Sequence, residues 1–237
     1  MIKFFLHNKL VKFFYAIFLL PLCFTLLKTL IYVITNVEFQ DKLVVAFFIG
    51  MGSYVVFHLV FYKPIKFYVL GHELVHILST YLCGGKIKNI KISNFYGYVN
   101  VNKVNTFIAL SPYFVPFYSI ILTLLWIICR HLFKLNVPTE VFVFLLGFSI
   151  MFHLILTIYA IYVGQTDFRI SGWLFSIVVI LIVNCLILIF LFTFIFSSKI
   201  KIDELKHYFF DVLVSTYKFF YFKLKLLLGL FLKNFNR

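Results

Sequence analysis

The stretch YVLGHELVHILSTYLCGG, residues 68–85, places two histidines and a glutamate in a segment that is otherwise mostly apolar. The chain around it is unusually apolar as well: 63% of its 237 residues are hydrophobic, 22% are aromatic and 13% are charged. This composition lies outside the range of soluble domains and predicts an integral membrane protein. Ionisable side chains inside a membrane segment are costly and are usually retained for function, so this stretch is the first candidate for a site.

Apolar runs of about 20 residues, which is the length of a membrane-spanning helix, recur along the chain. There are six such runs, at about residues 12–35, 43–63, 65–83, 106–129, 138–164 and 171–197. Short connectors join them, and no small-residue cleavage site of a signal peptide follows the first run. The sequence therefore predicts an all-α polytopic membrane protein, with about six transmembrane helices packed as one bundle over residues 1–198.

A segment rich in β-forming residues separates the third run from the fourth. In GGKIKNIKISNFYGYVNVNK, residues 84–103, β-branched and aromatic residues flank the turn-forming letters NFYG. Isoleucines precede the turn, and tyrosine and valines follow it, as in the two strands of a hairpin. We expect a short β-hairpin between Ile87 and Val101, directly after the segment that carries the histidines.

The C-terminal segment, residues 199–237, differs in composition from the rest of the chain. It carries eight of the 22 lysine and arginine residues, interleaved with phenylalanine, leucine and tyrosine. This pattern is typical of a basic amphipathic helix that lies on the membrane surface and contacts anionic lipid headgroups. The formal net charge of +14 lies in this tail and at the ends of the apolar runs, which indicates lipid rather than nucleic acid as the partner.

His72 and His76 are four positions apart, so an α-helix places both imidazoles on one face, one turn apart. That separation suits two ligands of one tetrahedral zinc ion. Glu73, next to the first histidine, projects beside such an ion and can accept a proton from a zinc-bound water. The motif HELVH therefore predicts a zinc site with a general base. The alternative is a pair of structural histidines that hydrogen-bond between helices.

A catalytic zinc site of this kind needs a third protein ligand. The four cysteines are scattered through apolar segments with no CxxC pair, which disfavours a cysteine ligand. Six other carboxylates lie in the connector before the motif, at the far end of the fifth run or in the tail: Glu38, Asp41, Glu140, Asp203, Glu204 and Asp211. Asp167, in QTDFRISG, remains, because the third and fifth runs would end on the same side of the membrane.

Two alternatives to this assignment stay open. His153 lies in the fifth run, about 21 Å along a helix from Asp167, so only one of these two side chains can be near the metal. Asp167 could also be an ordinary loop aspartate that pairs with Arg169 or caps the sixth run. His58, in the second run, is expected to hydrogen-bond within the bundle instead.

Together these segments resemble the site-2 protease family of intramembrane zinc metalloproteases, over about residues 65–190. The matching pieces are GHELVHIL at 71–78, GGKIKNIKI at 84–92 leading to YGYV at 96–99, IALSPYFVP at 108–116 and QTDF at 165–168. The resemblance implies that His72, His76 and Asp167 are the zinc ligands and that Glu73 is the general base. It also implies that the hairpin presents the substrate as an added strand, which is a common mode of peptide binding.

Two positions differ from the family pattern. The family often has Gly-Pro and an asparagine in the middle span, where this chain has Ser111-Pro112 and then Val115-Pro116. The family's Asp-Gly at the third ligand is Asp167-Phe168 here. The asparagine contact of the family is therefore missing from this sequence.

The expected function is a zinc-dependent endopeptidase that cleaves a membrane-embedded or membrane-adjacent peptide or protein. The alternatives are a metal-ion transporter, because intramembrane histidine and aspartate also mark ion paths, and a catalytically inactive partner protein. Richness in lysine, asparagine, phenylalanine and isoleucine indicates a bacterial source. Together with the apolar runs, this predicts a multi-pass protein of the bacterial cytoplasmic membrane. With the N-terminus inside, the positive-inside rule puts Asp167 outside, whereas the resemblance puts the zinc near the cytosolic side.

Overall fold

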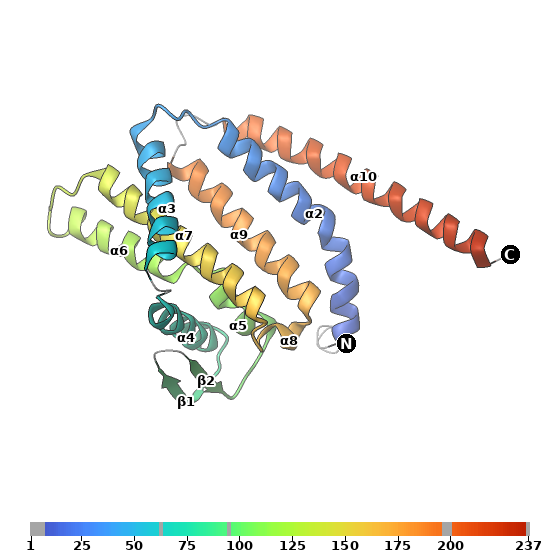
Figure 1. The fold of residues 1–237 in the computed structure, drawn as a ribbon, viewed down its shortest axis with the longest axis horizontal. Helices are drawn as coiled ribbons and strands as arrows, with labels where there is room; N and C mark the ends of the chain where they lie inside the picture. The colour runs from blue at the N-terminus through green and yellow to red at the C-terminus, as the bar shows by residue number, and fades with distance from the viewer. Residues whose placement is uncertain (1–7, 62–63, 94–95, 196–200, 236–237) are drawn as a thin grey trace. The chain divides into compact units, whose positions relative to one another are not determined.

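The computed structural model describes residues 8–61, 64–93, 96–195 and 201–235. The described chain is mostly helical and contains one two-stranded antiparallel sheet (Figure 1). Four of its helices are long and apolar enough to cross a membrane: α2 (Lys9–Thr35), α3 (Lys42–Val60), α7 (Thr139–Val163) and α9 (Trp173–Ile195). In α9 the candidate span covers Trp173–Thr193. These features fit the predicted all-α membrane protein, but the expected count of six spans is too high.

Two of the expected spans differ from a straight apolar helix. The run at 65–83 forms α4 (Ile65–Leu82), but its lysine, histidines and glutamate make it too polar to count among the candidate spans of the described chain. The run at 106–129 is broken into α5 (Thr106–Leu110), the 3₁₀ turn η1 (Ser111–Tyr113) and α6 (Phe117–His131). The two parts meet at 71°, and the bent pair would bring the count to five if it crosses as one span. Proline at the break prevents the helix from continuing.

The chain divides into two compact units, residues 38–180 and the two terminal segments together. In the terminal unit, α10 (Ile202–Phe235) lies alongside α2 (Figure 1). The rings of Tyr32 and Tyr208 stack with centroids 4.0 Å apart, and the hydroxyl of Tyr217 donates a hydrogen bond to the carbonyl of Phe18. The tail is therefore a helix, as expected, but one that packs on a candidate membrane span. Its contact with anionic headgroups stays a prediction.

In the central unit, α3 and α7 approach each other closely at two glycines. A β-carbon added at Gly50 would collide with the backbone carbonyl of Phe144, and one added at Gly147 would collide with that of Phe47. Glycine at both positions therefore allows the two helix backbones to touch. Small residues play this role where membrane helices pack without help from the hydrophobic effect.

The predicted hairpin is present. Strands β1 (Ile87–Ile92) and β2 (Gly97–Val101) pair antiparallel, with Ile90 opposite Val99. The tip of the turn, residues 94–95, lies outside the described residues. At the base, the side chain of Asn102 accepts a hydrogen bond from the backbone N–H of Lys86, and both strands pack against α4. The hairpin is thus held on the helix that carries the histidines.

Replacing Gly147 or Gly50 by alanine should destabilise the central unit by about 1–3 kcal/mol, because the new β-carbon meets backbone that cannot rotate away. Thermal unfolding in detergent micelles measures the loss. Gly52→Ala in α3 is the matched control: nothing lies within 4 Å of its added β-carbon, so this variant should be as stable as the wild type or slightly more stable. Equal melting temperatures for all three variants would contradict the close approach of α3 and α7.

Candidate metal centre

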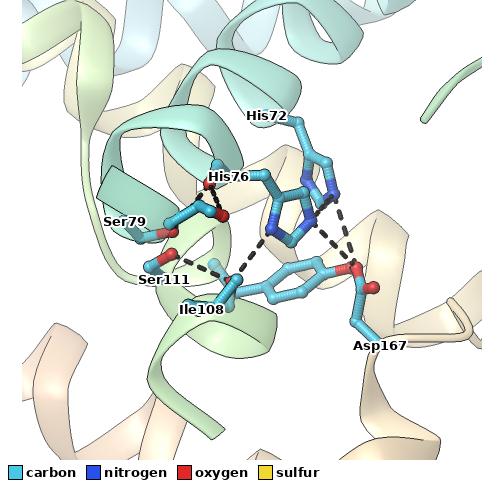
Figure 2. A network of polar contacts seen from close by, with 8 residues as sticks. His72, His76, Ser79, Ile108, Ser111 and Asp167 are labelled. Atoms are coloured by element: carbon cyan, nitrogen blue, oxygen red, sulfur yellow. Dashed lines mark hydrogen bonds and ion pairs between the residues drawn. The ribbon is translucent and has the colours of Figure 1, made fainter. Parts of the chain in front are cut away.

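Helix α4 brings the two motif histidines together. The Nε2 atoms of His72 and His76 are 3.1 Å apart, and the rings meet edge to face (Figure 2). Both side chains are nearly buried, and Glu73 between them is 5% exposed. The i, i+4 spacing of the motif is therefore realised on a single helix face, as the sequence predicts.

Asp167 joins the histidines from a turn after α7. Two glycines with positive φ bracket this turn: Gly164 ends α7 and Gly172 follows the short helix α8 (Phe168–Ser171). Such backbone angles favour glycine, because a β-carbon would be strained there. The Oδ2 atom of Asp167 lies 3.4 Å from Nε2 of His72 and 3.5 Å from Nε2 of His76 (Figure 2). The structure thus groups the three residues that the sequence analysis selected.

The spacing of these three atoms fits one small metal ion. Zinc bonds of about 2.0–2.2 Å in tetrahedral geometry separate neighbouring ligand atoms by about 3.3 Å. The measured separations are 3.1, 3.4 and 3.5 Å. In addition, Nδ1 of His76 lies 2.9 Å from the carbonyl oxygen of Ile108, which can only accept a hydrogen bond. Nδ1 therefore carries a proton, and Nε2 of the neutral ring offers its lone pair to a metal.

The charge state of Asp167 also suits a ligand. Burial alone would raise its pKa, but the adjacent His72 and His76 outweigh burial and hold the pKa well below its ordinary value. The carboxylate is therefore ionised at neutral pH. Its side chain makes no capping hydrogen bond to α8, the short helix that follows it.

His153, the competing third ligand, faces a different space. It lines a small cavity that His72 also borders, together with Tyr68 and Phe152, and it is absent from the lining of the cleft that contains Asp167. In the part of the chain that the structure describes, the group of candidate metal ligands consists of His72, His76 and Asp167. His58, on α3, shares a hydrogen bond with the hydroxyl of Tyr54 on the same helix.

The three residues open onto a cleft of about 260 Å³ that has strand β2 as one wall. Glu73 lines the same cleft, next to the strand. A β-carbon added at Gly97 would lie 2.8 Å from Oε1 of Glu73 and 2.7 Å from its Cγ atom. The strand backbone therefore runs directly past the carboxyl group. The letters YGYV marked the hairpin in the sequence, but only the fold reveals that this glycine adjoins Glu73.

A second residue that the sequence did not single out is Tyr113, in η1. Its hydroxyl donates a hydrogen bond of 2.7 Å to Oδ2 of Asp167, across 54 positions of the chain. The letters SPY lie in the broken middle helix, and no local pattern relates them to Asp167. The contact depends on the bend between α5 and α6 and on the turn after α7.

Comparison of the chain with protein-family models, with curated protein sequences and with solved structures gives no match.

Replacing Asp167 by alanine should weaken zinc binding by at least about 100-fold, because it removes a ligand and not only an outer contact. Replacing His153 by alanine is the matched control and should leave zinc affinity unchanged. Competition with a chromophoric chelator, using purified protein in detergent, measures both. If Asp167→Ala kept wild-type affinity while His153→Ala lost it, the ligand assignment would be wrong.

Proposed function

We propose that the chain is a zinc-dependent endopeptidase of the membrane, similar to the site-2 protease family. The observation that carries this proposal is the convergence of His72, His76 and Asp167 at 3.1–3.5 Å, beside Glu73, in a cleft bordered by a strand. A metal held only for structure would have no use for an adjacent carboxyl group or for an open cleft.

In this proposal His72, His76 and Asp167 hold one zinc ion. The bound ion would supply Lewis acidity and lower the pKa of a water molecule, so that the water can lose a proton at neutral pH and its oxygen can add to the carbonyl carbon of a peptide bond. A carboxylate oxygen of Glu73 accepts the proton of that water, and the same carboxyl group then delivers a proton to the leaving amine. Glu73 suits this role because it is on the same helix as both histidines and lines the same cleft.

Strand β2 offers a place for the substrate. In the described part of the chain β1 pairs with one edge of β2, and no strand pairs with the other edge of β2. An extended peptide could add to the other edge, which would hold it along the cleft by backbone hydrogen bonds. An extended substrate is needed, because a helical peptide in a membrane keeps its carbonyl groups bonded. The absence of a side chain at Gly97 lets such a peptide and Glu73 come together.

The apolar helices support a membrane location for this chemistry. Four helices, or five with the bent pair, are long and apolar enough to cross a bilayer, while α4 carries the polar site. We infer a multi-pass protein of a bacterial cytoplasmic membrane whose substrates are membrane proteins or peptides next to the membrane. A transporter would also bind metal, but it has no need of a carboxyl group beside the ligands, which favours hydrolysis.

Glu73→Gln tests this proposal, because it keeps the shape of the side chain and removes its ability to accept a proton. Cleavage of a tagged single-span protein with an extended juxtamembrane segment, in proteoliposomes, should fall by about 100-fold or more while zinc content stays at the wild-type level. His76→Ala should lose both zinc and cleavage. Wild-type cleavage by Glu73→Gln would show that Glu73 is not the base.

A further inference from the structure

Tyr113 occupies a fixed position between the two elements that carry the candidate ligands. Its side chain is fully buried, and its ring meets that of His72 edge to face, with centroids 5.2 Å apart. On the side of the turn, its ring packs against Phe168, with centroids 4.7 Å apart. Its backbone carbonyl accepts a hydrogen bond from the hydroxyl of Thr157 on α7. Contacts from α4 and α8 therefore hold the ring, and the contact from α7 holds the backbone of the same residue.

The hydroxyl of Tyr113 reaches the ligand atom of Asp167. It donates to Oδ2 at 2.7 Å, and Oδ2 is also the oxygen that lies 3.4 and 3.5 Å from the two histidine nitrogens. The hydrogen bond is made to an ionised carboxylate, so it belongs to the stronger class of hydrogen bonds. The oxygen that receives this hydrogen bond is thus the one that faces His72 and His76.

Asp167 has particular need of such an anchor. It lies in a turn between two glycines and makes no capping hydrogen bond to α8. The hydroxyl of Ser171 ties α8 to Thr106 of α5, which locates the turn but not the carboxylate. The two histidines, by contrast, are placed by one regular helix, and His76 is oriented further by Ile108. Asp167 is the ligand whose direction the backbone specifies least.

Tyr113 is not among the residues that line the cleft, so it has no direct access to a substrate there. We propose that Tyr113 is a positioning residue that holds Asp167 in the orientation required for metal binding. This inference rests on the proposed zinc centre and adds a residue to its outer contacts. Partners of this kind usually contribute a factor of about 10–100 to metal affinity.

Tyr113→Phe tests the inference, because phenylalanine keeps the ring contacts with His72 and Phe168 and removes only the hydroxyl. Zinc affinity, measured by chelator competition on the full-length protein, should fall by about 10–100-fold. The absorption spectrum of the cobalt-loaded variant should shift, because the ligand field changes with the direction of the carboxylate. The melting temperature of the metal-free variant should stay near that of wild type.

Tyr68→Phe is the matched control. The hydroxyl of Tyr68 is buried next to His72, yet it has no hydrogen-bond partner in the described part of the chain. Its removal should change zinc affinity by less than about twofold, well below the 10–100-fold effect of an outer-shell partner. A loss of zinc affinity as large as that of Tyr113→Phe would mean that removing any buried hydroxyl near His72 weakens zinc binding. It would overturn the specific role of Tyr113.

A double-mutant cycle shows whether Tyr113 acts through Asp167. In the background of Asp167→Ala, the further change Tyr113→Phe should cost no additional zinc affinity, because the partner is already gone. Additive losses would overturn the positioning role, as would wild-type zinc affinity and an unchanged cobalt spectrum in Tyr113→Phe. Absence of zinc binding by the wild type would overturn the metal centre itself and this inference with it.

Discussion

The site depends on one long-range contact, the approach of the Asp167 carboxylate to the histidine pair on α4. A helix brings two histidines together without help, because their spacing in the chain is that of one helical turn. A third candidate ligand must come from elsewhere, and Asp167 lies in a turn about 90 positions later.

Several features of the fold contribute to that placement. The close packing of α3 on α7 through Gly50 and Gly147 holds α7, and the turn follows directly from its end. The bend between α5 and α6 lets the middle segment contact both α4 and α8, so that it contributes Ile108 to one histidine and Tyr113 to the aspartate. The hairpin forms one wall of the cleft, and Gly97 of strand β2 lies against Glu73. The break between η1 and α6 interrupts an apolar helix, and the residues on its N-terminal side contact both His76 and Asp167.

The sequence predicted the parts that depend on local pattern. The helix of the histidines, the hairpin between Ile87 and Val101 and the C-terminal helix follow from periodicity and turn residues, and the structure has all three. Asp167 could be selected because carboxylates are scarce in this chain and most lie in the wrong segments. The number of spans was overestimated, because length alone does not reveal the break at Pro112 and Pro116 or the polarity of α4. Tyr113 and Gly97 could not be found, because their partners are distant in sequence.

In the proposed metal centre, two imidazoles and one carboxylate of this chain hold a single zinc ion. X-ray absorption at the zinc edge, on purified protein with one equivalent of zinc, tests it most directly. We expect nitrogen and oxygen ligands at about 2.0–2.2 Å, with the multiple-scattering signal of two imidazoles and no sulfur at about 2.3 Å. A sulfur shell, which would indicate a cysteine such as Cys83 at the end of α4, or failure to retain zinc at all, would contradict it.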